Sequence, residues 1–263
     1  MQPPSASSSS RAPIAIAQSP VLPRRPDDML RTRGGPRCTS CALQPACLEA
    51  ESCEQMLADG ASLASGWRMI RRGQPLYRTG DVFGHLYAVV SGSLKTVLFH
   101  SEGREQICGF PGVGDLLGMD GIDTGRHACD AIALEDTQVC IIPFDMLEQR
   151  CRQAAATQHH LLRVMSAEIV REQRFFMLLG RMSADERLAS FLVGMSNKLS
   201  ARGYSASEFH LRMTREDIGN HLGMKLETVS RTLSKFQAQG WISVRQKHVA
   251  LRDLQALRTL SCQ

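Results

Sequence analysis

The sequence predicts an α+β protein in which an all-β domain, a long helix and a winged helix-turn-helix follow one another. Residues 67–144 contain short apolar runs separated by glycines, which is typical of a β-sandwich or barrel. The clearest strands are expected at 86–90, 94–99 and 137–142. Residues 145–182 contain no glycine before Gly180 and carry apolar residues at helical spacing. Residues 183–263 contain two helix-start signals, a glycine turn and a short hairpin.

These observations divide the chain into five segments. Residues 1–37 are rich in Pro, Ser and Arg and lack periodic apolar residues, so we expect a disordered basic tail. The remaining four segments are a cysteine-rich segment at 38–53, a β sensory domain at 54–150, a dimerisation helix at 151–182 and a DNA-binding domain at 183–263.

Length and composition limit the class of protein. The chain of 263 residues is long enough for two domains, and no run approaches the roughly 18 apolar residues of a membrane span. The longest apolar piece near Met1 covers only residues 14–17, so we expect no secretory signal and a cytoplasmic protein. The sequence contains no P-loop, dinucleotide-binding fingerprint or paired nucleophile and base, so we expect no enzyme and no catalytic residues.

Charge is distributed unevenly along the chain. Residues 1–37 have a net charge of +4, residues 38–182 of −4 and residues 183–263 of +5. A basic C-terminal third after an acidic middle favours contact between that end and a polyanion such as nucleic acid.

The predicted long helix carries a heptad pattern. A seam at this spacing predicts a parallel helix dimer, and the alternative is an amphipathic helix that lies on its own domain. One seam position is a carboxylate, Glu172, which favours controlled association. The predicted dimer-interface residues are Leu162, Met165, Ile169, Glu172, Phe176 and Leu179.

The C-terminal segment has the signals of a winged helix-turn-helix. Ser183 and Glu186 have the spacing of a capping box, which predicts a helix to about residue 199. Thr214 begins a second helix that ends at Leu222, and Gly223 forms the turn into a longer helix at 226–237. Residues 242–251 read as a β-hairpin wing.

The outer face of the 226–237 helix has the chemistry of base recognition. Arg can donate two hydrogen bonds to guanine, Glu can accept one from cytosine, and Ser can do either. The alternative interpretation makes Glu227 and Arg231 a simple i,i+4 pair on the helix surface. The predicted DNA-contacting residues are Glu227, Ser230 and Arg231, with Ser234 on the same face, opposite the buried Val229, Leu233 and Phe236.

Nine cysteines cannot all pair within one chain, and several of them are clustered. Cys38, Cys41 and Cys47 fall within ten residues, a spacing that suits an iron-sulfur cluster or another metal. Spacing alone leaves three interpretations open, which are an iron-sulfur cluster, a zinc site that uses Cys53, and a disulfide or free thiols. The candidates for a fourth ligand are Cys53, Cys108, Cys129 and Cys140.

Taken together, five motifs resemble the fumarate and nitrate reduction regulators, the oxygen-sensing branch of the cyclic-AMP receptor protein superfamily. The likeness runs from about Cys38 to the wing near Val249. The motifs are Cys38-Thr-Ser-Cys41 followed by Cys47, LYAVVSGSLK at 86–95, GDLLG at 114–118, VCIIPF at 139–144 and ETVSR at 227–231.

The resemblance implies a β-roll like the jelly roll of cyclic-nucleotide-binding domains, and a [4Fe-4S] cluster held by Cys38, Cys41, Cys47 and Cys140. It implies a homodimer that binds double-stranded DNA at inverted repeats with TTGAT-like half-sites when the cluster is intact. RNA polymerase is the implied partner, and the implied targets are genes of anaerobic and microaerobic metabolism, activated or repressed. Cys53, Cys108, Cys129, Cys151 and Cys262 receive no role from it.

Cyclic nucleotides are not expected as ligands. The nucleotide binders of the superfamily carry a Glu in the phosphate cassette and an Arg followed by Ser or Thr, and this sequence shows Asp115 and Arg126-His127 at the matching places. The alternative function is a regulator controlled by a cyclic nucleotide or a thiol switch, with a structural zinc or no metal.

Overall fold

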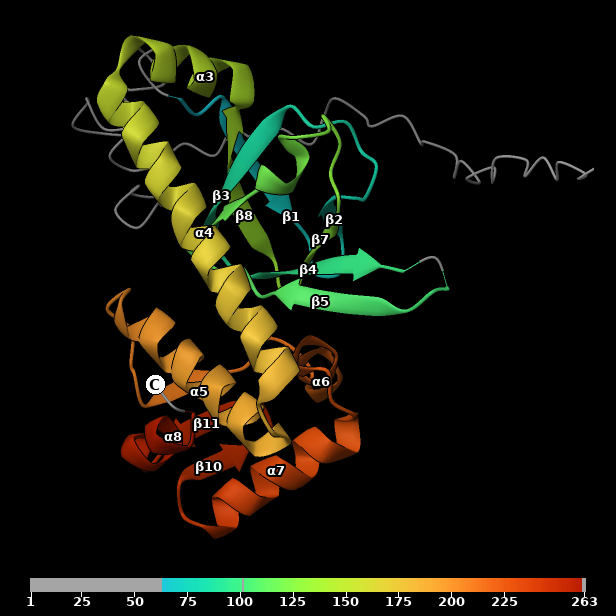
Figure 1. Ribbon diagram of the computed structural model, residues 1–263, viewed down its shortest axis with the longest axis vertical. Coiled ribbons are helices and arrows are strands. Elements are labelled where there is room, and N and C mark those ends of the chain that lie inside the picture. Colours follow the sequence, from blue (N-terminus) through green and yellow to red (C-terminus); the bar gives the residue numbers. More distant parts are fainter. Residues whose placement is uncertain (1–62, 101, 262–263) are drawn as a thin grey trace, which may run out of the picture.

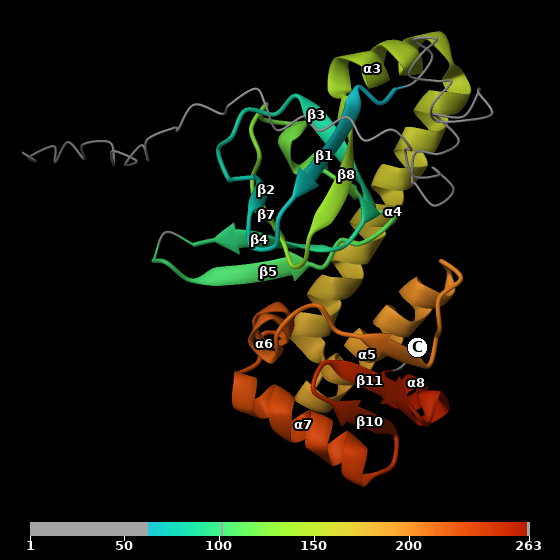
Figure 2. The same cartoon turned by 180° about the vertical axis from the view of Figure 1, so that it is seen from behind.

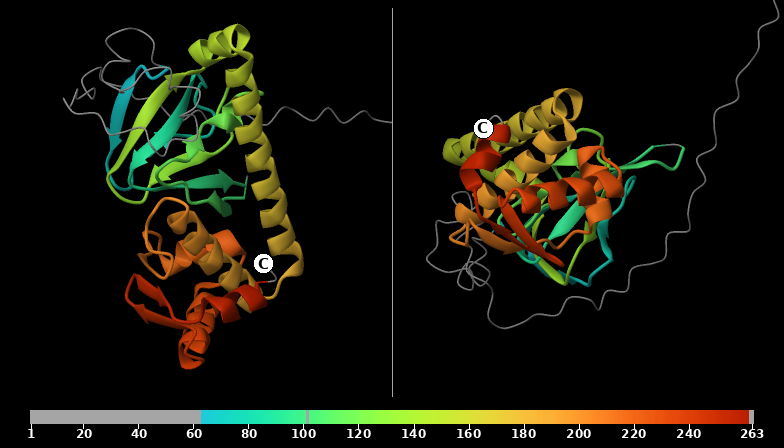
Figure 3. Two further views of the ribbon diagram at one scale, coloured as in Figure 1. Left: turned by 90° about the vertical axis from the view of Figure 1, so that its left-hand side faces the viewer. Right: turned by 90° about the horizontal axis from the view of Figure 1, so that it is seen from below.

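The computed structural model describes residues 63–100 and 102–261 and confirms the predicted α+β fold class. A β-roll occupies one end, the helix-turn-helix domain occupies the other, and the long helix α4 runs alongside both (Figures 1 and 3). The predicted cluster ligands Cys38, Cys41 and Cys47, the alternative ligand Cys53, the basic tail and Cys262 lie outside the described residues.

Two four-stranded antiparallel sheets form the roll. One sheet has the order β1-β8-β3-β6 and the other β2-β7-β4-β5, so that β5 is an edge strand. The strands at 86–90, 94–99 and 137–142 are confirmed within one residue at either end. The elements are β1 (Gly66–Ile70), β2 (Pro75–Tyr77), β3 (His85–Ser91), β4 (Leu94–Phe99), β5 (Glu105–Gly109), β6 (Leu116–Leu117), the short 3-10 helix η2 (Met119–Gly121), β7 (Asp130–Ala133) and β8 (Thr137–Pro143).

Strands β3 and β8 are apolar on both faces. Side chains alternate across a strand, so Tyr87 and Val139 enter the core between the sheets, whereas Ala88 and Cys140 point to the outer face. Helix α3 (Phe144–Gln153) covers that outer face with Leu147. The end of the roll near α3 therefore contains a second, smaller core.

Two helices occupy residues 145–182, for which the sequence pattern predicts one continuous helix. Helix α3 ends at Gln153, Ala154 is extended, and α4 (Ala155–Arg181) then runs for 27 residues to the DNA-binding domain. The break turns the chain from the outer face of the roll onto the path of α4 (Figure 2).

The C-terminal domain is the predicted winged helix-turn-helix. Both predicted helix starts are confirmed, because Ser183 with Glu186 and Thr214 with Asp217 form capping boxes. The sequence did not indicate β9, which joins the wing in a sheet of order β10-β11-β9, or α8. The elements are α5 (Ala184–Ser200), β9 (Glu208–His210), α6 (Arg215–Leu222), α7 (Leu226–Ala238), β10 (Ile242–Arg245), β11 (His248–Leu251) and α8 (Leu254–Leu260).

The turn between β3 and β4 tolerates only glycine at residue 92. Gly92 has φ +84°, and a Cβ there would lie 2.8 Å from the Asp136 carbonyl oxygen. Gly73 has a similar φ of +79° but open space around it. We expect Gly73→Ala to lower the free energy of unfolding by about 1 kcal/mol through backbone strain alone, and Gly92→Ala to lower it by a further 1–3 kcal/mol, roughly, through overpacking.

Urea unfolding of the two full-length variants measures this difference. Equal losses in the two variants would show that the backbone at residue 92 can move away from the added methyl group.

Candidate nucleic-acid interface and cysteine site

Helix α7 presents the predicted reading residues to solvent. Val229, Leu233 and Phe236 are buried in the domain core, as expected. Glu227 and Arg231 are exposed on the opposite face. The structure therefore leaves a carboxylate and a guanidinium one helical turn apart on an open surface, where they can reach base edges.

The turn between α6 and α7 requires two glycines. Gly223 ends α6 in the left-handed conformation, with φ +62°. A Cβ on Gly219 would lie 2.6 Å from the Met224 carbonyl oxygen, so α6 must pass close to the turn. These contacts fix the angle at which α7 leaves α6.

Arg215 adds a cation beside the reading face. Its guanidinium donates a hydrogen bond of 3.2 Å to the Ser230 hydroxyl, and its own side chain is exposed. Ser230 is half-buried and its hydroxyl accepts this bond, whereas the exposed Ser234 donates its hydroxyl to the Ser230 carbonyl oxygen at 3.0 Å. The sequence did not single out Arg215, because it belongs to α6 and its proximity to Ser230 arises from the turn.

Arg187 joins the end of α4 to the helix-turn-helix. Its guanidinium donates to the carbonyl oxygens of Leu179 at 2.7 Å, Met182 at 2.9 Å and Leu222 at 2.9 Å. One side chain thus satisfies carbonyls at the ends of two helices. No local pattern predicts this residue, because the Leu222 acceptor lies 35 residues away in sequence.

Cys140 lies in the outer core of the roll. Its side chain is 7% exposed and packs among Leu63, Ala64 and Leu147. Leu63 and Ala64 directly precede β1 in the sequence, so the residues just before the first strand lie beside Cys140. Cys151 of α3 packs against the same apolar side chains, a proximity that the sequence could not indicate.

Two other cysteines lie away from the outer core that contains Cys140. Cys129 is buried in the core between the sheets, and burial followed by the nearby Asp120 carboxylate raises the pKa of its thiol. Burial and then the charge of Glu172 raise the pKa of Cys108 on β5. A raised pKa disfavours the thiolate that binds metals. Within residues 63–100 and 102–261, no three His, Cys, Asp or Glu side chains are placed to hold a metal ion.

The residues matched to a nucleotide cassette do not converge. The Asp115 carboxylate pairs with Lys198 and Arg202 of the DNA-binding domain. Arg126 is exposed and donates to the Gly80 carbonyl oxygen at 2.7 Å.

His127, the residue after Arg126, is buried. It stacks on Tyr77 with ring centroids 3.7 Å apart, and its Nδ1 lies 3.3 Å from the Asp120 carboxylate. The interior at this point is filled by side chains of the chain itself.

The seam of α4 is largely exposed. Leu162 is 56%, Ile169 57% and Phe176 80% exposed, which is unusual for large apolar side chains. Met165 and Leu179 are half-buried, and Leu179 lies beside Gly223. Two further exposed apolar residues, Val170 and Met177, widen the surface that the heptad pattern indicated.

Comparison with known proteins gives the family. Residues 67–154 match the cyclic nucleotide-binding domain, and residues 186–260 match the Crp-like helix-turn-helix domain. The transcriptional activator protein Anr of Pseudomonas aeruginosa is 41% identical over 82% of this chain and 88% of its own length. The fumarate and nitrate reduction regulatory protein of Salmonella typhimurium is 38% identical over 85% of this chain and 90% of its own. The chain belongs to the family of fumarate and nitrate reduction regulators.

A solved structure shares the fold of this family member. FixK2 from Bradyrhizobium japonicum aligns with a TM-score of 0.69 and 31% identity, over 74% of this chain and 96% of that chain. The relatives are transcription regulators, which favours a non-enzymatic role in DNA binding for this regulator. Among its described residues, no helix is both long and apolar enough to cross a membrane.

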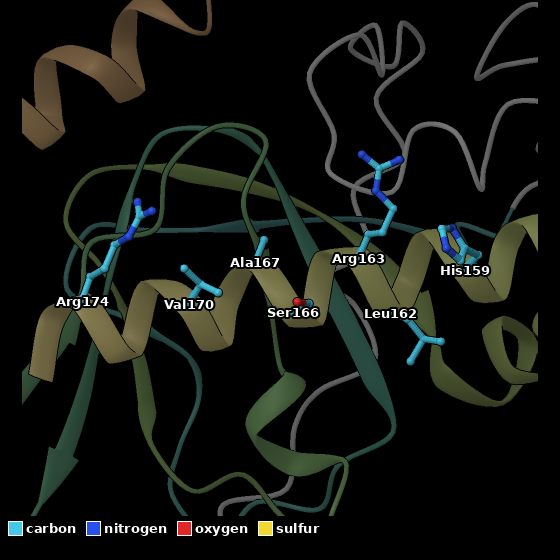
Figure 4. Close-up of a pocket in the computed structure, with 7 residues that line it drawn as sticks. All are labelled: His159, Leu162, Arg163, Ser166, Ala167, Val170 and Arg174. Carbon is cyan, nitrogen blue, oxygen red and sulfur yellow. The ribbon is translucent and has the colours of Figure 1, made fainter.

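A groove of about 670 Å³ runs along α4 of this regulator (Figure 4). In the figure Arg163, Ala167, Val170 and Arg174 point to one side of the helix and Leu162 points to the other. The described lining comes from this one helix, so the groove is a surface hollow in which basic side chains flank the exposed apolar face. Its lining residues are His159, Leu162, Arg163, Ser166, Ala167, Val170 and Arg174.

We expect Arg231→Ala to remove preference at one base pair of the half-site. A bidentate contact between arginine and guanine contributes about 1–3 kcal/mol of discrimination. For Arg215, which is exposed beside this face, we expect a contact with phosphate instead. Arg215→Ala should therefore weaken binding to all sequences about equally. Binding to a set of single-base half-site variants measures both effects. An equal loss on every variant for Arg231→Ala would assign that residue to the phosphate backbone.

Proposed function

We propose that this protein is an oxygen-responsive transcription regulator whose [4Fe-4S] cluster, intact without oxygen, promotes dimerisation and DNA binding. The proposed ligands are Cys38, Cys41, Cys47 and Cys140. The observation that supports it most is the position of Cys140, buried on the outer face of β8 beside Leu63 and Ala64, the described residues that follow the cysteine-rich segment in sequence.

The chemistry of these residues fits the proposed group. Thiolates are the soft, charged ligands that iron-sulfur clusters require, and the apolar surroundings of Cys140 limit access of water to its sulfur. Sixteen positions separate Cys47 from Leu63, which packs beside Cys140. Such a cluster supplies iron-thiolate bonds that are lost when oxygen oxidises it.

The residues around Cys140 connect it to α4. Leu147 of α3 and Leu161 of α4 pack in the same outer core. A ligand set that draws the cysteine-rich segment against Cys140 therefore acts on the residues that place the first turns of α4. We infer that this packing sets the position of the α4 seam for dimerisation.

Glu172 opposes dimerisation in this proposal. In a parallel helix pair its carboxylate would approach that of the second copy, and two like charges about 4 Å apart cost on the order of 1 kcal/mol in water and about 4 kcal/mol at an effective dielectric of 20. Burial of the apolar side chains of Ile169 and Phe176 favours association. The two contributions oppose each other, so in this proposal a change in the position of α4 decides between monomer and dimer.

The dimer presents two copies of α7 about one DNA turn apart to an inverted repeat. We propose half-sites like TTGAT, with Arg231 on the guanine, and RNA polymerase as the partner at target promoters. The proposed targets are genes of anaerobic and microaerobic metabolism, activated or repressed, and the proposed compartment is the cytoplasm. A second candidate, in which Cys53 completes a zinc site or the thiols form a switch, predicts colourless protein.

We expect Cys140→Ser to abolish the cluster. Protein purified without oxygen should be brown with about four irons and four sulfides per chain, and the serine variant should lose this absorbance. Cys151→Ser is the matched control. Cys151 packs against the same apolar side chains as Cys140, and its replacement should leave the iron content unchanged. A brown Cys140→Ser protein and a colourless Cys53→Ser protein would instead make Cys53 the fourth ligand.

We expect Glu172→Ala to shift the protein toward dimers in air. Burial, with a smaller effect from Glu168, raises the pKa of Glu172. Its charge and the repulsion are present above that pKa and vanish as pH falls through it, so the wild type should dimerise more at lower pH and the variant should not respond. Gel filtration across a pH series measures both effects.

Glu168→Ala is the comparison variant for this experiment. It removes a carboxylate that is paired with Arg171 at 2.5 Å and that raises the pKa of Glu172, so it should move the pH response of dimerisation to lower pH without abolishing it. An unchanged elution volume for Glu172→Ala at every pH would refute the repulsion between the two carboxylates.

A further inference from the structure

The DNA-binding domain contacts the β-roll directly through the end of α6. The Asn220 side chain accepts a hydrogen bond of 2.6 Å from the Ile107 amide of edge strand β5 and donates one of 3.0 Å to the Glu105 carbonyl oxygen. In the ribbon, α6 lies between β5 and the lower part of α4 (Figures 1 and 2). Asn220 therefore pairs with β5 much as a neighbouring strand would.

Two neighbouring side chains complete this contact. Gln106 donates to the backbone oxygens of Asn220 at 2.8 Å and His221 at 3.2 Å. His221 places Nδ1 2.9 Å from the Ile107 carbonyl oxygen and stacks on Phe175 of α4 with ring centroids 4.5 Å apart. Burial lowers the pKa of His221, which favours the neutral ring. The β-roll, α4 and α6 thus meet at one residue.

Ion pairs flank these hydrogen bonds. Although burial alone would raise the pKa of Asp115, Lys198 and Arg202 hold it below its ordinary value. These groups are mostly buried, so solvent screens them less than surface pairs. The pairs between the domains are Asp115–Lys198, Asp115–Arg202 at 2.5 Å, Lys95–Asp217 at 2.6 Å and Glu135–Arg212 at 3.2 Å.

The contact leaves the DNA-reading face open. Glu227, Arg231 and Ser234 are exposed while α6 is docked on β5. The docked orientation therefore does not obstruct the surface of α7 that faces bases. Arg187 and the short connection between Arg181 and Ala184 attach the domain to α4, and the contact with β5 attaches it to the β-roll as well. Attachment to both elements restrains the orientation of the domain more than attachment to α4 alone.

We propose that Asn220 and His221, docked on strand β5, fix the orientation of α7 relative to the β-roll and thereby determine which half-site spacing the dimer accepts. The inference rests on the proposed binding of a dimer to an inverted repeat. Asn220 and His221 are positioning residues in this account, because they act through the orientation of α7 and do not touch DNA.

The preference of the protein for one half-site spacing is the quantity to measure, because a purely structural role of Asn220 and His221 would not change it. Adding two base pairs moves the half-sites about 7 Å further apart and turns one relative to the other by about 70° around the DNA axis. Full-length protein, purified without oxygen, is titrated with inverted repeats of varied spacing and with a single half-site. The test variants are Asn220→Ala and Asp115→Asn. Asn197→Ala is the control, since Asn197 accepts its bond from Arg258 within the DNA-binding domain.

We expect the wild type and Asn197→Ala to prefer one spacing strongly. Loss of two to three interdomain hydrogen bonds in Asn220→Ala should reduce that preference by about fivefold to tenfold, with half-site affinity within about twofold of the wild type. Asp115→Asn should also reduce the preference for one spacing.

Three results would overturn the inference in distinguishable ways. An unchanged spacing preference in both test variants, with thermal unfolding like that of the control, would show that the contact does not orient α7. Tighter binding of the test variants to every repeat would make the contact inhibitory. Absence of any spacing preference in the wild type would refute the proposed dimeric binding itself.

Discussion

Strand β8 must be covered on both faces, and much of the molecule is arranged around that constraint. Val139 faces the space between the sheets, while Cys140 and Ile142 face outward. Apolar side chains on the outer face need a partner, and α3 with residues 63–64 provides it. The same packing brings the start of α4 to the outer core. A buried cysteine, residues 63–64 before the first strand and the first part of the long helix are therefore neighbours for one physical reason.

Helix α4 has two sets of contacts that compete for its surface. One side packs against its own chain through Leu161, Phe175 and Leu178. The other side exposes Leu162, Ile169 and Phe176. A displacement of α4 that improves packing of the exposed side must also move Phe175 and hence His221. The helix therefore connects association between copies to the orientation of the DNA-binding domain within one copy.

Local patterns were sufficient to predict three strands of the roll, the helices α5 to α7 and the wing from the sequence. The capping boxes at Ser183 and Thr214 and the turn at Gly223 depend on residues within a few positions, and the structure has them where expected. The break at Ala154 and strand β9 were missed because neither has a strong local signal. Asn220, His221 and Arg187 could not be found either, since each has a partner 35 to 115 residues away that is brought near only by folding. The roles of the cysteines rested on a family resemblance, because spacing alone allowed several chemistries.

The docking of α6 on β5 also bears on how the protein avoids aggregation. An edge strand presents unpaired amide and carbonyl groups, which are a template for strands of other chains. The outward-facing backbone groups of Glu105 and Ile107 are occupied by Asn220 and His221. If the DNA-binding domain separated from the roll, this edge would become available for intermolecular β-pairing. A regulator that moved its DNA-binding domain by undocking would thus risk self-association through β5 each time it changed state, whereas motion of α4 with α6 still docked avoids that exposure.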